Sequence, residues 1–212
     1  MIIYLFLLGI LVSALFMVSA KRISALINGF SLQAIFLFMI TIYAAARERS
    51  AQLYIIAGLL FLIKVLLIPG YLRRIVKRIK VSEDLGLFLN PSVSLFVAAI
   101  LAYLAYLFAG KFVSIADNTE NTAFIVSVSM VLIGIFIMVF RMKALAQIIG
   151  LLVMENGLFL LAATISGGMP FFVEIAIFFD IFLCVIILEI FVYKINKLFT
   201  HIDVDKLTEL KG

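Results

Sequence analysis

Charged side chains are scarce in this 212-residue chain, where Asp, Glu, Lys and Arg together make up only 14% of the residues. The chain also has no Trp, a single Cys, Cys184, and a single His, His201. One Cys cannot form an internal disulfide, and one Cys and one His cannot supply a metal site or a haem-ligand pair. A Gly-rich phosphate-binding loop is also absent. The sequence therefore predicts no metal, no cofactor and no catalytic residue, and any redox chemistry is expected in other proteins.

Apolar residues dominate instead. They make up 66% of the chain, against roughly 45–50% in soluble proteins, and the mean hydropathy is +1.30. Each membrane span needs about 20 apolar residues, and lipid forces every backbone group to pair within its own helix. The predicted fold class is therefore an all-α integral membrane protein. Seven transmembrane helices are expected, at residues 2–20, 25–46, 53–72, 91–110, 122–140, 144–166 and 170–193.

Positive charge is distributed unevenly between the connections. Most of the 17 Lys and Arg residues lie in the first, third and fifth connections and in the C-terminal tail. The second and fourth connections hold only Arg47, Arg49 and Lys111. Because cytoplasmic loops carry the excess of Lys and Arg, we expect the N-terminus outside and the C-terminus in the cytoplasm. Topology thus explains the net charge of +5, and the mixed basic and aromatic clusters of a nucleic-acid-binding protein are absent.

The densest basic stretch runs from Arg73 to Lys80 and covers about two helical turns. We expect it at the inner membrane surface, near anionic headgroups or a cytoplasmic partner. A topology signal without any ligand is the other interpretation.

Five ionisable residues interrupt the apolar runs. A charge near the bilayer centre costs at least ~2.5–3.5 kcal/mol, so such residues are rare and usually functional. Proton and ion pathways are the commonest reason to keep them. The candidate ion-translocation residues are Lys64, Glu155, Glu174, Asp180 and Glu189. For Glu174 and Glu189, which fall near the membrane surfaces, an ordinary interfacial carboxylate is an alternative interpretation.

Three of these residues, Lys64, Glu155 and Asp180, are expected at a similar depth in the membrane. A rise of about 1.5 Å per residue places Glu155 about 16 Å and Asp180 about 15 Å from the start of their spans. Both then lie near the middle of a hydrocarbon core about 30 Å thick, on spans that the short connection 167–170 makes antiparallel neighbours. Lys64 lies at a similar depth, too deep to reach the surface, so we expect it to pair with a carboxylate. The sequence leaves open whether the partner is Glu155 or Asp180.

Two amide side chains also lie inside apolar runs: Gln33 in the second run, and Asn156 beside Glu155. They are candidates for the same polar pathway. Polar contacts between packed helices explain them as well.

Two stretches carry a family resemblance over the full length of the chain. Residues 63–69 read Ile-Lys-Val-Leu-Leu-Ile-Pro, and residues 154–157 read Met-Glu-Asn-Gly. Together with the seven spans, they resemble the hydrogenase-4 component E family, which belongs to the complex-I-like hydrogenases.

The C-terminal part also resembles NuoK, the small three-span membrane subunit of respiratory complex I, through residues 149–156 and the tail. This resemblance divides the chain into a four-span region, 1–110, and a NuoK-like three-span region with a cytoplasmic tail, 111–212. Where NuoK has a Glu, this chain has Leu152, and Glu155 lies three residues on along roughly the same helix face.

The resemblance implies a non-catalytic, multi-pass membrane subunit of a group 4 hydrogenase-type respiratory complex, located in the cytoplasmic (inner) membrane of a prokaryotic cell. The implied partners are other membrane subunits, including antiporter-like and NuoH-like subunits, a hydrogenase or other redox module, and the lipid bilayer. The buried carboxylates would then contribute to proton or sodium translocation coupled to redox chemistry in other subunits. The alternative is a scaffold subunit of the membrane arm without its own ion path. An independent small-solute transporter fits less well, because no broken helix or large polar cavity is evident.

Overall fold

The computed structural model describes residues 2–49, 51–78, 89–112 and 118–165. All regular structure in these ranges is helical, and six helices are long and apolar enough to cross a membrane. They coincide with the first six predicted runs, so the all-helical membrane fold is confirmed for this part of the chain. The seventh run, 170–193, lies outside the described residues, and the count of seven spans stays a prediction.

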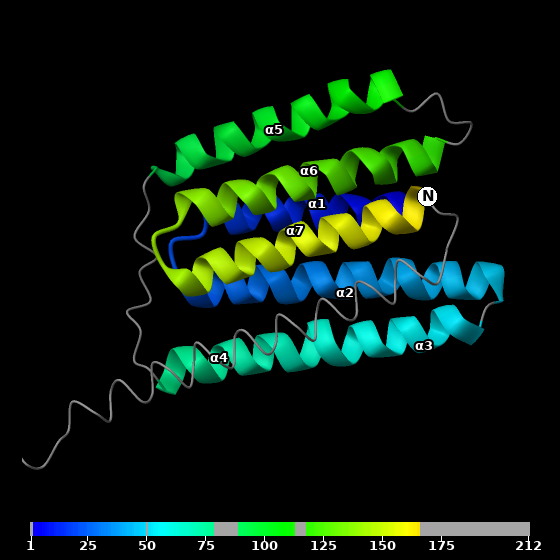
Figure 1. Cartoon of the computed structure of the whole chain (residues 1–212), viewed down its shortest axis with the longest axis horizontal. Coiled ribbons are helices and arrows are strands. Elements are labelled where there is room, and N and C mark those ends of the chain that lie inside the picture. The colour runs from blue at the N-terminus through cyan, green and yellow to red at the C-terminus, as the bar shows by residue number, and fades with distance from the viewer. Residues whose placement is uncertain (1, 50, 79–88, 113–117, 166–212) are drawn as a thin grey trace, which may run out of the picture.

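Five of the spans are single α-helices, and the third span is composite. The single helices are α1 (Ile2–Ser19), α2 (Ile23–Glu48), α5 (Pro91–Phe112), α6 (Asn118–Phe140) and α7 (Ala144–Ile165). The third span consists of α3 (Ala51–Leu60), the π-helix η1 (Phe61–Leu67) and α4 (Ile68–Arg78). Figure 1 shows that successive spans run in opposite directions, so the C-terminal ends of α1, α4 and α6 lie at the same end of the bundle.

That end gathers most of the basic residues that the described ranges contain, and we call it the basic end. Its members are Lys21, Arg22, Arg73, Arg74, Lys77, Arg78, Arg141 and Lys143. Arg47 and Arg49 lie at the opposite end, where α2 finishes. This is the charge asymmetry that the predicted topology requires, although the side of the membrane that each end faces stays a prediction.

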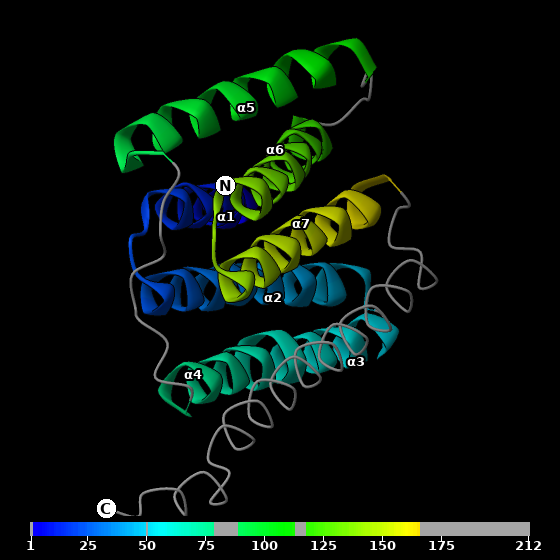
Figure 2. The same ribbon diagram turned by 60° about the vertical axis from the view of Figure 1, so that its left-hand side comes forward.

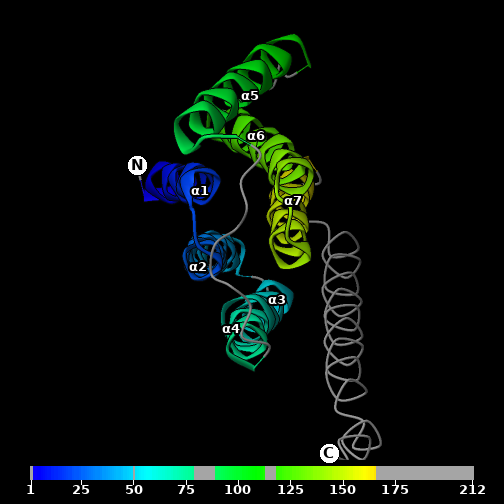
Figure 3. The ribbon, with the colours of Figure 1, turned by 90° about the vertical axis from the view of Figure 1, so that its left-hand side faces the viewer.

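The spans form two rows when the bundle is viewed from the basic end (Figure 3). The first row is α1, α2 and the third span, and the second is α5, α6 and α7. α1 packs on α6, and α2 packs on α7, so the apolar core lies between the rows. Figure 2 shows α5 at the edge of the bundle, beside α6.

The backbones of α6 and α7 approach each other closely at glycines. A Cβ on Gly134 would lie 2.5 Å from the backbone nitrogen of Met154, and one on Gly157 would lie 2.9 Å from the carbonyl oxygen of Ser127. Small residues allow such close packing between membrane helices. Glu155 precedes Gly157 by two residues, about 200° around the helix. The glycine contact therefore directs Glu155 away from α6 and toward the first row.

Candidate functional site

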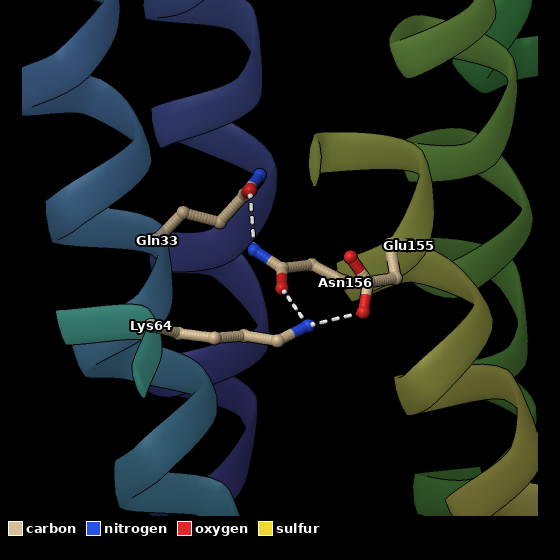
Figure 4. A network of polar contacts seen from close by, with 4 residues as sticks. All are labelled: Gln33, Lys64, Glu155 and Asn156. Carbon is tan, nitrogen blue, oxygen red and sulfur yellow. Dashed lines mark hydrogen bonds and ion pairs between the residues drawn. The ribbon is translucent and has the colours of Figure 1, made fainter. Parts of the chain in front are cut away.

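Four buried polar side chains form a cluster inside the apolar bundle, where α2, η1 and α7 meet. Gln33 comes from α2, Lys64 from η1, and Glu155 and Asn156 from α7 (Figure 4). Their exposed fractions are 0%, 1%, 3% and 0%, in that order. Groups buried to this degree have to satisfy one another, because bulk water does not reach them.

Lys64 is the centre of the cluster. Its Nζ donates hydrogen bonds to Asn156 Oδ1 at 2.9 Å and to Glu155 Oε1 at 3.2 Å, and the second contact is an ion pair. The ring centroid of Phe159 lies 5.9 Å from the same nitrogen, within range of a cation–π interaction. The ammonium group thus has a charged, an amide and an aromatic neighbour, which together offset the cost of burying it.

Gln33 extends the cluster to a third span. Asn156 Nδ2 donates a hydrogen bond to Gln33 Oε1 at 3.1 Å. This bond fixes which end of the Asn156 amide faces α2, and so it turns Oδ1 toward Lys64. Gln33 therefore orients an acceptor of Lys64 through its hydrogen bond to Asn156 (Figure 4).

Lys64 lies within a π-helix, which the sequence did not predict. The Ile68 N–H donates to Ile63 O, five residues earlier, as this helix type requires. Pro69 follows immediately and has no N–H, so an α-helical bond to the carbonyl of Val65 is impossible in any case. The span nevertheless continues through Pro69 to Arg78. Short π-helical segments are rare and frequently occur at functional sites.

The structure confirms the expectation that Lys64 pairs with a carboxylate, and it identifies Glu155 as a partner. It also brings Gln33 and Asn156 into the same cluster. Asp180, Glu174 and Glu189 lie outside the described residues, so their positions relative to the pair stay predictions. Phe159 was not singled out from the sequence, although its spacing of four residues from Glu155 places both on one helix face.

Arg141 is a second buried cation, 4% exposed, which the sequence had grouped with the basic connections. Its Nη2 donates to Val18 O at 2.6 Å and to Met17 O at 3.3 Å. These carbonyls belong to the last turn of α1, where the i to i+4 helical bonds end; Met17 O also accepts the Ala20 N–H at 3.2 Å. Burial lowers the pKa of Arg141 to about 10. Arg141 therefore ties the connection between α6 and α7 to the end of α1, and no sequence pattern distinguishes it from a topology signal.

The fold and the site define a multi-pass helical membrane protein with a buried Lys–Glu pair in its interior. Comparison with known proteins is more specific. The chain is 27% identical over 203 residues to hydrogenase-4 component E of Escherichia coli K12, and the match covers 95% of this chain and 94% of that protein. The same protein of Shigella flexneri matches to the same extent. An uncharacterized protein of Mycobacterium tuberculosis is 24% identical over 204 residues, with 96% and 93% covered.

No family model and no solved structure matches the chain. The predicted resemblance to hydrogenase-4 component E is confirmed over nearly the full length. The resemblance of the C-terminal part to NuoK, and the division at residue 110 that follows from it, stay predictions.

Proposed function

We propose that this chain is a membrane subunit of a multi-subunit, complex-I-like hydrogenase, and that the Lys64–Glu155 pair is a step in its ion path. Similarity to hydrogenase-4 component E along nearly the whole chain supports the first part. The single observation that carries the second part is the buried ion pair inside two apolar spans. Redox chemistry takes place in a separate hydrogenase or redox module. Antiporter-like and NuoH-like subunits are the expected neighbours in the membrane.

The cluster has the parts needed to bind and release a proton or a sodium ion. When Glu155 takes up a proton, its carboxyl no longer neutralises Lys64. Asn156 Oδ1, at 2.9 Å, and the Phe159 ring still stabilise the ammonium group. Because Gln33 orients the Asn156 amide, this acceptor stays directed at Lys64. The carboxylate can therefore change its charge without leaving the lysine unsatisfied.

The remaining candidate carboxylates, Asp180, Glu174 and Glu189, extend this path in the proposal. On an ideal helix, Glu174 to Asp180 and Asp180 to Glu189 are steps of about 9 and 13 Å. Direct proton transfer does not span such distances, so water or side chains of neighbouring subunits fill the gaps.

The ion path is tested by Glu155→Gln in the assembled complex. Gln keeps the size of the side chain and an oxygen acceptor for Lys64, while it removes the negative charge and the ability to bind a proton. Because Lys64 also keeps Asn156 Oδ1 at 2.9 Å, assembly should be intact while coupled ion transport is lost. The assay compares ion uptake with redox turnover in membrane vesicles. Glu120→Gln, at an exposed carboxylate in the first turn of α6, is the matched control and should transport normally. Normal transport by an assembled Glu155→Gln complex would refute the ion path.

A scaffold subunit without an ion path is the second candidate, and α5 favours it. This edge helix exposes Phe96 (68%), Tyr103 (60%) and Tyr106 (59%), large side chains that suit lipid or a neighbouring subunit. Phe96→Ala combined with Tyr103→Ala should then reduce assembly of the complex. Under the scaffold hypothesis, Glu155→Gln leaves the transport per assembled complex unchanged.

The proposed topology has seven spans, with the N-terminus outside and the C-terminus in the cytoplasm. Reporter fusions after Lys77 and after Gly212 should be cytoplasmic, and a fusion after Arg49 should be outside. An inverted result at Lys77 and Arg49 would refute the orientation. A reporter outside after Gly212 would refute the seventh span alone.

A further inference from the structure

The end of the third span has two chemically different faces. Ile68, Leu72 and Ile75 are 1%, 1% and 2% exposed and belong to the apolar core between the rows. Arg73, Arg74 and Lys77 are exposed on the other face. The apolar spacing of four and three residues fixes the rotation of α4, so these cations point away from the core at the basic end.

The cationic face of α4 carries a shallow, open depression. A shallow groove of about 450 Å³ is lined by Gly70, Arg73, Arg74 and Lys77, a volume within the range of about 300–1,000 Å³ that is usual for ligand sites. Gly70 leaves the groove open, since no neighbouring atom lies within 4 Å of the position that a Cβ would take. Among the described residues, those that line the groove include three cations and no carboxylate, so this lining attracts an anion.

One of the cations is held in place by a neighbouring span. Arg73 Nη2 donates a hydrogen bond to Asn28 Oδ1 of α2 at 2.9 Å. A guanidinium group has five N–H donors, so this bond positions the group and leaves other donors for an anion. Positioning before binding reduces the entropy lost on binding.

The groove continues into a lipid-facing apolar strip. Leu66 and Leu67, which precede Gly70 by four and three residues, are 54% and 55% exposed. Spacings of three, four and seven residues keep Leu66, Leu67, Gly70, Arg74 and Lys77 on one side of the helix. Along the helix, the exposed leucines are followed by Gly70 and then by the cations. A phospholipid has the same order of chemical groups, with acyl chains, then glycerol, then phosphate.

We infer that this groove binds an anionic phospholipid, with its phosphate at Arg73, Arg74 and Lys77 and an acyl chain along Leu66 and Leu67. Basic pockets at the ends of membrane helices are suited to such headgroups. A free phosphate ion would use the same cations but not the apolar strip. If the cations served only to set the orientation of the chain in the membrane, neither the groove nor the apolar strip would be needed.

The test measures lipid binding to the purified full-length protein in neutral detergent, by native mass spectrometry. Phosphatidylglycerol should bind more tightly than phosphatidylcholine. At about fivefold per cation near a lipid phosphate, Arg73→Gln combined with Arg74→Gln should weaken phosphatidylglycerol binding about 25-fold. Lys21→Gln with Arg22→Gln removes the same charge from the same end, outside the groove, and should leave this affinity unchanged.

Gly70→Leu separates a site from a charged surface, because it fills the groove without altering any charge. It should weaken phosphatidylglycerol binding, and the open space around Gly70 means that the fold should tolerate it. Inorganic phosphate should not displace the lipid. The inference is overturned if Gly70→Leu binds normally, if the Lys21 and Arg22 control loses as much affinity as the groove pair, if both lipids bind equally, or if inorganic phosphate competes at equal concentration.

Discussion

Neutralising both members of the Lys64–Glu155 pair should restore the stability that neutralising one of them removes. In Lys64→Met, the carboxyl of Glu155, on a residue only 3% exposed, loses the ammonium group at 3.2 Å. Removing one partner from a buried ion pair costs about 3–5 kcal/mol of unfolding free energy. Glu155→Met should cost less, because Lys64 keeps Asn156 and the Phe159 ring as neighbours.

The double variant Lys64→Met/Glu155→Met removes both charges of the Lys64–Glu155 pair. Replacing a buried ion pair with apolar residues of similar volume is often neutral or stabilising by about 1–4 kcal/mol. The double variant also removes the hydrogen-bond donor of Asn156 Oδ1, which lowers the unfolding free energy by about 1–3 kcal/mol. These two effects nearly cancel, so we expect the double variant to be about as stable as the original protein. The interaction energy between the two positions is then close to the sum of the two single costs, which is at least about 3 kcal/mol.

The measurement is the unfolding free energy of the purified protein in mixed micelles, from titration with sodium dodecyl sulfate followed by circular dichroism. Independent sites add to within about 0.5 kcal/mol, so additive effects would refute direct pairing. Ion transport by the assembled complex gives the second readout. If the pair belongs to the ion path, the double variant recovers stability but not transport. If transport also recovers, the pair is structural.

Three further predictions follow from other contacts. Gln33→Leu should change the unfolding free energy by less than about 2 kcal/mol. It removes Gln33 Nε2, which is buried without a hydrogen-bond partner among the described residues, but it also removes the acceptor of Asn156 Nδ2. The same change should lower ion transport in the assembled complex, since the Asn156 amide loses the acceptor that orients it; lowered stability with normal transport would contradict this. Arg141→Met should lower the unfolding free energy by about 2–3 kcal/mol through loss of charged hydrogen bonds to α1, whereas the exposed control Lys21→Met should change it by less than about 0.5 kcal/mol. Equal effects would contradict the capping role. Gly134→Val should destabilise by at least about 1–3 kcal/mol, because its Cβ meets the backbone of α7 at 2.5 Å. Gly58→Ala, with no atom within 4 Å, is the control and should be neutral or stabilising by up to about 1 kcal/mol.

The sequence was sufficient for the spans and for the depth of the charges within the described ranges. Apolar run length determines a membrane helix, because lipid offers no alternative partner for the backbone, and the six described helices begin and end close to the predicted runs. Depth follows from residue count along a helix, which is why Lys64 was expected to need a carboxylate.

Only the tertiary structure decided which side chains meet. Depth says nothing about rotation around a helix or about which spans are neighbours, and these depend on packing. The glycines between α6 and α7 turn Glu155 toward the third span, and the π-helix η1 sets the direction of Lys64. The sequence alone therefore determined that polar side chains lie at a similar depth inside an apolar bundle. The close packing of the helices decided that Lys64 contacts Glu155 and Asn156, that Gln33 orients the amide between them, and that Arg141 binds the end of α1 rather than remaining in water.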